Sequence, residues 1–325
     1  MKRFLIALGL LLAFAAVAEW ANVRGLHISL WRYLPLLVSL SLVLAAFIGL
    51  TNPGVVAKLR AWAGRSARVA VGIPLLLLVP YAIYALGSGI FSAEAFLKLL
   101  AYIAAPNLLL LPDRQRSPLR AGWRDFTAML ALSLPVSAGW LAGIWTYPME
   151  LYFFRPLYSV CVGVYAFAVV RRLEGVGYRL FFRPKDFTDG LLHFLGFAAV
   201  GIPLGYALHF IRFRPSPVPI EAFMIEFVGT YLTVAIPEEL LFRGIFQNFL
   251  EQSFSSERRS LYALLIASPI FGLSHMGHPP VPNWRYAIMA TVAGLYYGNA
   301  YRRRRRVSSS ALTHALVDTV WHSWF

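Results

Sequence analysis

The sequence predicts an all-α protein, a polytopic membrane bundle of about 9–11 transmembrane helices, and three observations support this fold class. Of the 325 residues, 58% are hydrophobic and 14% are charged, and the mean hydropathy is +0.61. A soluble globular domain carries about 25% charged residues. Apolar stretches of membrane-spanning length recur along the chain, and basic residues gather between them. Together these features indicate an integral membrane protein.

Each predicted span holds close to the roughly 20 mostly apolar residues that a helix needs to cross a bilayer. The number is a range because one stretch is short and the last is half polar. The spans are 4–20, 33–50, 69–87, 97–112, 127–145, 156–170, 188–210, 220–242, 261–277, 285–301 and 308–324.

The first of these spans has an alternative interpretation. A basic start, an apolar run and Ala16-Val17-Ala18 make residues 1–18 resemble a cleavable signal peptide. We favour an uncleaved first helix, because basic loops then alternate in phase with non-basic ones and all fall on one side of the membrane.

The net charge of +15 is concentrated in six clusters that hold 22 of the 30 lysines and arginines. Basic loops resist translocation and face anionic lipid, so these loops and the N-terminus are expected on the cytoplasmic side. The arginine run at 302–306 is therefore interpreted as a membrane-surface anchor, and no nucleic-acid partner is expected. The clusters are Lys2-Arg3; Lys58, Arg60, Arg65 and Arg68; Arg114, Arg116, Arg120 and Arg124; 171–185; Arg258-Arg259; and 302–306.

Ionisable residues divide the chain into two parts. Up to about residue 186 the predicted spans carry almost none, whereas later spans contain several. Ionisable groups inside a bilayer are unfavourable and usually mark a functional site. We therefore expect an accessory N-terminal bundle in 1–186 and the chemistry in 187–325.

The first polar cluster is the stretch Glu238-Glu239-Leu240-Leu241-Phe242-Arg243. On a helix, Glu239 and Arg243 share a face four residues apart, so they can pair and offset each other's burial. Glu238 points about 100° away and has no polar partner three or four residues on. Pro237 leaves a carbonyl unpaired one turn earlier and is expected to bend the helix. The same residues also fit a charge pair at a cytoplasmic helix end.

The second cluster contains Phe271 and His275, four residues apart, with His278 three residues further on. A histidine in a membrane helix is often only a hydrogen-bonded interior residue, and that interpretation stays open here. His278 precedes two prolines and is expected at the edge of a loop, outside the site.

The third cluster lies in the last predicted span, where His314 and Asp318 share one face and His322 continues it for another turn. A helix this polar would line the interior of the bundle or a wet cavity. The alternative is a terminal amphipathic helix on the membrane surface.

In this order, the motifs EExxxR, FxxxH and HxxxD resemble the signature of the CPBP group of intramembrane proteases. That group comprises the type II CAAX prenyl proteases and their bacterial relatives, among them bacteriocin-processing and abortive-infection proteins. The resemblance covers about residues 187–325 and implies a core of four consecutive helices. Residues 1–186 carry no such motif, and the long N-terminal part suggests a member from the cytoplasmic membrane of a prokaryote.

The resemblance also implies roles for individual residues. Glu238 would activate a water that His275 helps to position, and His314 with Asp318 would stabilise the oxyanion. The expected structural and orienting residues are Glu239, Arg243 and Phe271. A carboxylate in a low-dielectric cavity is a stronger base than in water, which suits peptide hydrolysis.

Asp318 departs from many CAAX-type members, which have asparagine there. An ionised aspartate cannot donate a hydrogen bond. Either Asp318 is protonated, or it orients and charges His314, which then donates alone. No cofactor is expected, although a zinc set from Glu238, His275, His314 and Asp318, with His322 as a further candidate, is a second possibility. The chain lacks HExxH, so such a site would need several helices.

The leading hypothesis is an intramembrane endopeptidase that cleaves near the C-terminus of a membrane-embedded or lipidated protein or peptide. The partners are then this substrate and the bilayer. Neither the Gly-x-Ser-Gly of serine-type nor the Gly-x-Gly-Asp of aspartyl-type intramembrane proteases is present. Two non-hydrolytic alternatives are a proton-coupled transporter and an immunity or scaffold protein that keeps the motifs without turnover.

Overall fold

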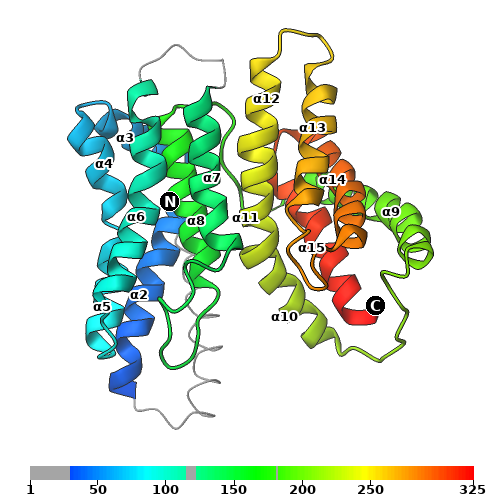
Figure 1. The fold of residues 1–325 in the computed structure, drawn as a ribbon, viewed down its shortest axis with the longest axis horizontal. Coiled ribbons are helices and arrows are strands. Elements are labelled where there is room, and N and C mark those ends of the chain that lie inside the picture. Colours follow the sequence, from blue (N-terminus) through cyan, green and yellow to red (C-terminus); the bar gives the residue numbers. More distant parts are fainter. Residues whose placement is uncertain (1–29, 115–121, 181) are drawn as a thin grey trace. The chain divides into compact units, whose positions relative to one another are not determined.

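The structure is a computed structural model, and it describes residues 30–114, 122–180 and 182–325. Every regular element in these ranges is helical (Figure 1), which confirms the predicted all-α class. The predicted span 4–20 and the alternative signal peptide at 1–18 lie outside the described residues. The chain forms two compact units, the first ending at Arg172 and the second beginning at Leu173.

The first unit is a helical bundle with an aromatic and aliphatic core. A buried ion pair joins Arg171 to Asp125 at 2.7 Å, and the same aspartate accepts from the backbone N–H of Gly122. The helices are α2 (Leu30–Gly49), α3 (Pro53–Ala63), α4 (Ala67–Leu75), α5 (Leu78–Gly87), α6 (Ala93–Leu110), α7 (Trp123–Ser137) and α8 (Phe154–Val164), with a 3₁₀ turn η1 (Leu111–Asp113) and a π-helical segment η2 (Tyr165–Val170).

One predicted span in this unit is too long at its C-terminal end. The hydropathy pattern predicts 127–145, whereas α7 ends at Ser137. Pro135 lies in its last turn, and Gly139 and Gly143 follow with φ values of +68° and +77°. Such left-handed backbone suits glycine and ends a right-handed helix.

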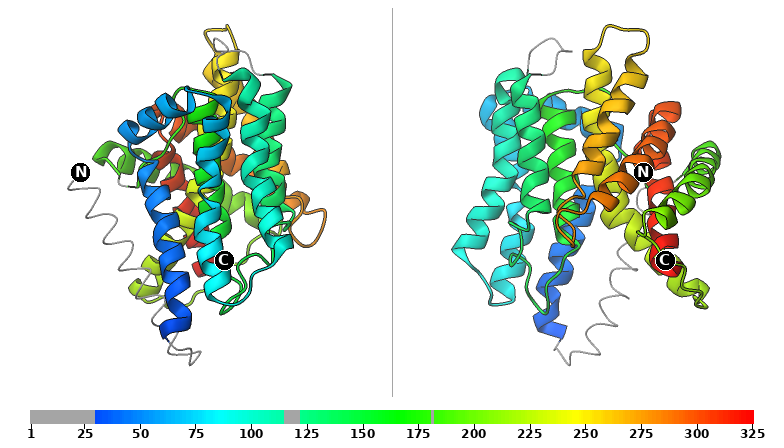
Figure 2. Two further views of the ribbon diagram at one scale, coloured as in Figure 1. Left: turned by 90° about the vertical axis from the view of Figure 1, so that its left-hand side faces the viewer. Right: turned by 45° about the vertical axis from the view of Figure 1, so that its right-hand side comes forward.

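The second unit is built from one long helical rod and four further helices. The rod covers Ile220–Ser253 and comprises α10 (Ile220–Thr230), η3 (Tyr231–Ala235), α11 (Ile236–Glu239), η4 (Leu240–Gln247) and α12 (Asn248–Ser253). The others are α9 (Pro184–Ala207), α13 (Arg259–Leu273), α14 (Trp284–Arg304) and α15 (Val307–Trp324). Figure 2 shows α9 beside α14 and α15, which it contacts.

The rod continues past Pro237 as a single helical segment rather than breaking there. Proline cannot donate the backbone hydrogen bond of a regular helix. Here the wider π-helical segments η3 and η4 lie on either side of the short α11 that contains Pro237. Because π-type turns change which side chains share a face, they determine where the residues on each side of Glu238-Glu239 point.

Four helices in the described ranges are long and apolar enough to cross a membrane: Ala67–Gly87, Ala93–Asp113, Pro184–Ala207 and Ile220–Ser253. The pair Tyr33–Gly49 and Pro53–Ala63, bent by 94°, would make a fifth span. Phe154–Val170 and Arg259–Leu273 are apolar but shorter, and α14 and α15 have nearly their predicted bounds but are too polar to qualify. A polytopic helical membrane bundle is therefore confirmed, while the number of about 9–11 spans stays a prediction.

Helices α13 and α14 approach each other closely at Gly272. A Cβ atom on this residue would overlap the hydroxyl of Thr291 and the backbone carbonyl of Ala287. Small residues allow this close backbone approach, which is a main source of helix association in membranes. The contact holds the C-terminal end of α13, and thus the start of the His275 loop, against α14.

We expect Gly272→Ala to destabilise the protein by about 1–3 kcal/mol, the range for overpacking a well-packed contact. The control is Gly229→Ala in α10, where an added methyl group meets no atom within 4 Å. Thermal unfolding in detergent should show a lower midpoint for Gly272→Ala alone. Equal midpoints for the two variants would contradict the close approach.

Candidate active site

The three motifs meet at one place in the second unit. Glu238 and Glu239 lie on α11 and Arg243 on η4 of the rod. His275 lies two residues beyond the end of α13, and His314 with Asp318 lies on α15. Residues that are distant along the chain are thus within a few ångströms of one another. The sequence predicted this convergence only through the family resemblance.

A fully buried ion pair forms the base of the site. Arg243 Nε donates to Glu239 Oε2 at 3.1 Å, and both side chains have no exposed surface. The spacing of four residues predicted this pair. The other carboxylate oxygen, Oε1, lies 3.0 Å from Nδ1 of His314. Glu239 therefore links the rod to α15.

The guanidinium group of Arg243 also contacts an aromatic ring. Its Cζ atom lies 4.9 Å from the centre of the Phe271 ring, and its Nη1 and Nη2 atoms are buried without a hydrogen-bond partner among the described residues. An arginine over an aromatic face gains cation–π stabilisation, which is larger when the groups are desolvated. This contact explains why a phenylalanine is suited to the first position of the FxxxH motif.

Glu238 is the free carboxylate of the site. Its Oε2 atom is buried and without a hydrogen-bond partner in the described part of the chain, although the side chain as a whole is 36% exposed. It lies 3.9 Å from Nε2 of His275 and 4.0 Å from Nε2 of His314. These separations exceed a direct hydrogen bond, and one water molecule can contact all three atoms.

The two histidines are oriented through their Nδ1 atoms. Nδ1 of His275 lies 2.8 Å from the carbonyl oxygen of Phe271, so this nitrogen carries the proton and Nε2 faces Glu238. His314 donates from Nδ1 to Glu239, and its Nε2 lies 3.3 Å from Oδ2 of Asp318. A fixed Nδ1 partner determines which nitrogen is available for chemistry.

Aromatic rings from α14 pack against both histidines, and sequence reasoning missed them. Tyr286 lies 4.7 Å from His275 between ring centres, and Tyr297 stacks on His314 at 4.6 Å and 17°. One face of α14 carries side chains at helical spacing: Tyr286, Ala290, Ala293 and Tyr297. This spacing is the sequence pattern from which the two tyrosines could have been predicted to share a face. His278, expected outside the site, is exposed but stacks on His275 at 5.8 Å.

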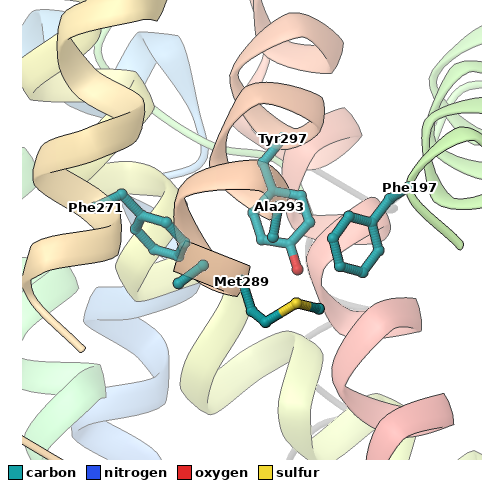
Figure 3. Packing of buried hydrophobic residues seen from close by; sticks show 6 residues of the cluster. Phe197, Phe271, Met289, Ala293 and Tyr297 are labelled. Atoms are coloured by element: carbon teal, nitrogen blue, oxygen red, sulfur yellow. The ribbon is translucent and has the colours of Figure 1, made fainter. Parts of the chain in front are cut away.

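A cavity of about 380 Å³ opens beside these groups. Glu238, His275, His314 and Asp318 line it together with mostly apolar side chains. The apolar wall includes Phe197, Met289 and Tyr297, and Figure 3 shows these residues gathered around Ala293. His322 also lines the cavity, where its Nδ1 lies 2.9 Å from Glu226 on α10.

The described residues contain no group of three or more His, Cys, Asp or Glu side chains arranged to hold a metal ion. The zinc set considered from the sequence (Glu238, His275, His314 and Asp318) stays a prediction. His322, the further candidate, contacts Glu226 through its Nδ1.

Residues 220–320 match the family model described as type II CAAX prenyl endopeptidase Rce1-like. This segment contains all three motifs, and the match confirms the family resemblance. It supports an intramembrane protease of the CAAX type in general terms. No curated protein and no solved structure matches the chain.

Glu239→Gln should destabilise the protein by about 3–5 kcal/mol, because it leaves the buried charge of Arg243 unpaired. Glu238→Gln should change stability little, since the Glu238 carboxylate has no such partner. Unfolding of both variants in detergent measures this difference. Similar losses for both would contradict the division of roles between the adjacent glutamates.

Proposed function

We propose that this protein is an intramembrane endopeptidase that hydrolyses a peptide bond near the C-terminus of a membrane-embedded or lipidated protein or peptide. Glu238 acts as the general base, His275 positions the water, and His314 with Asp318 forms the oxyanion site. The observation that carries this proposal is the carboxylate oxygen of Glu238, which has no hydrogen-bond partner among the described residues and lies about 4 Å from Nε2 of both histidines.

In the first step, a water molecule donates one hydrogen to Glu238 and the other to Nε2 of His275. As Glu238 takes the first proton, the water oxygen forms a bond to the scissile carbonyl carbon, and the carbonyl electron pair moves to its oxygen. General-base assistance of this kind contributes about 10²–10⁴-fold to rate. The hydrogen bond from His275 to the Phe271 carbonyl keeps Nε2 as the acceptor.

The oxyanion is stabilised by His314. Glu239 lies at Nδ1 of this ring and Asp318 lies near Nε2, and two carboxylates stabilise a positive charge on the imidazole between them. The resulting Nε2–H can donate to the developing negative oxygen. Of the two roles considered for Asp318, this geometry supports the one in which it orients and charges His314.

The intermediate then collapses with cleavage of the C–N bond. Protonated Glu238 returns its proton to the leaving amine nitrogen, which restores the carboxylate for another cycle. No metal ion is required in this sequence of steps. Electrostatic stabilisation by fixed groups is stronger where bulk water is excluded, as in this apolar cavity.

The cavity supports an apolar substrate. Its volume of about 380 Å³ and its aromatic and aliphatic wall suit hydrophobic side chains or a lipid group next to the scissile bond. We further propose that the protein lies in the cytoplasmic membrane of a prokaryote with a cytoplasmic N-terminus, and that 1–186 serves as an accessory bundle to a catalytic core in 187–325.

Glu238→Gln should lower peptidase activity about 10²–10⁴-fold, because the amide cannot accept the proton from water. Glu221→Gln, an exposed change on the same helical rod, is the matched control and should be fully active. Purified variants in detergent are incubated with lipidated and unlipidated membrane peptides, and products are identified by mass. Retained cleavage by Glu238→Gln would refute the assignment of Glu238 as the general base. No cleavage by any form of the protein would favour the non-hydrolytic alternatives.

Activity should persist when the enzyme is dialysed against EDTA or phenanthroline, because the proposed steps use only side chains of this chain. The same preparations are assayed for cleavage and for bound zinc by elemental analysis. Loss of activity on chelation that zinc restores would instead favour the metalloprotease alternative.

A further inference from the structure

The arginine run at 302–306 mainly ties helix ends together rather than facing solvent. Arg306 binds both carboxylate oxygens of Asp186 at 3.0 Å, and Arg304 pairs with Asp189 on the same helix, α9. Arg302 donates to Asn299, and Arg305 binds Glu251 and Asn248. Only Arg303 of this run has no ion pair or hydrogen bond among the described residues.

Arg303 lines a pocket of about 490 Å³ at the start of α9 and the end of α14. The lining residues are Arg183, Pro184, Lys185, Asp186, Arg303, Arg304 and Arg306. Asp186 is fully buried and already binds Arg306 and the backbone N–H of Arg183. Three exposed cations in the pocket, Arg183, Lys185 and Arg303, are thus left without a carboxylate partner in the described ranges.

Positive charge accumulates around this pocket. The neighbouring Arg179, in the loop before α9, has a lowered pKa, caused first by burial and then by the positive charges of Arg183 and Arg306. Like charges at short range disfavour each other's ionised form. An anion in the pocket would relieve this repulsion, so the chemistry of the site favours a phosphate group.

An exposed apolar stripe continues from the pocket along α9. Phe187, Leu191 and Leu195 follow Arg183 at four-residue intervals and are 49%, 37% and 53% exposed. Residues at this spacing lie on one helix face, and α9 is long and apolar enough to cross a membrane. A phosphate held at the helix end would place attached acyl chains along this stripe.

We propose that Arg183, Lys185 and Arg303 form a binding site for the phosphate of an anionic membrane phospholipid whose acyl chains lie on Phe187, Leu191 and Leu195. The site is separate from the cavity that contains Glu238, and it does not depend on the proposed peptidase activity. Basic pockets at the cytoplasmic end of membrane helices are suited to such headgroups. A bound lipid would join the ends of α9 and α14, two helices that line the catalytic cavity.

The test compares lipid binding by delipidated protein in neutral detergent, measured by native mass spectrometry. The probes are phosphatidylglycerol, phosphatidylcholine with the same acyl chains, and inorganic phosphate. The test variant carries Arg183→Gln, Lys185→Gln and Arg303→Gln. The control variant loses three exposed charges elsewhere, through Arg258→Gln, Arg259→Gln and Arg285→Gln.

Wild type and control should bind phosphatidylglycerol more tightly than phosphatidylcholine, and the triple test variant should bind it about 100-fold more weakly, from about 1 kcal/mol for each basic residue. Arg303→Gln alone should weaken binding about 5-fold, which keeps the test valid if the triple variant does not fold. If the control variant bound phosphatidylglycerol as weakly as the test variant, the proposed lipid site would be overturned. Binding of inorganic phosphate or phosphatidylcholine as tight as that of phosphatidylglycerol would overturn the assignment to an anionic lipid.

Discussion

The buried carboxylate of Glu239 is the interaction on which the candidate site depends. One oxygen accepts from Arg243 and the other from His314, so a single side chain connects the helical rod to α15. Arg243 in turn lies over the ring of Phe271, whose carbonyl oxygen orients His275. A charge buried this deeply is stable only while its partners stay in place. The requirement to pair Glu239 therefore also positions both histidines.

The neighbouring Glu238 lies on the same helix but is partly exposed, in contrast to the fully buried Glu239. Adjacent residues point about 100° apart, so when Glu239 faces the buried arginine, Glu238 must face the cavity. Its partial exposure suits the proposed role, because a base has to exchange protons with substrate and water in every cycle. A buried, paired glutamate and a partly exposed one can thus be adjacent without competing for one partner.

Spacing within a helix was enough to predict the Glu239–Arg243 pair and the unpaired Glu238, because helical geometry fixes the angle between side chains. It could not predict that Glu239 also binds His314, 75 residues away, since that contact depends on how helices pack. The end of α7 at Ser137 was missed for a related reason. A hydropathy pattern does not detect the left-handed backbone conformation of Gly139 and Gly143, which follow the helix.

The arginine run shows how much composition leaves undetermined. Counting charges predicted a basic surface anchor, yet Arg304 and Arg306 pair with Asp189 and Asp186 at the start of α9. These pairs fix the N-terminal end of α15 against α9, so the ion pairs act on the helix that carries His314 and Asp318. A charge cluster at the end of a helix can therefore contribute to the geometry of a site two to three turns further along it. Only those cations that exceed the available carboxylates remain free to interact with lipid.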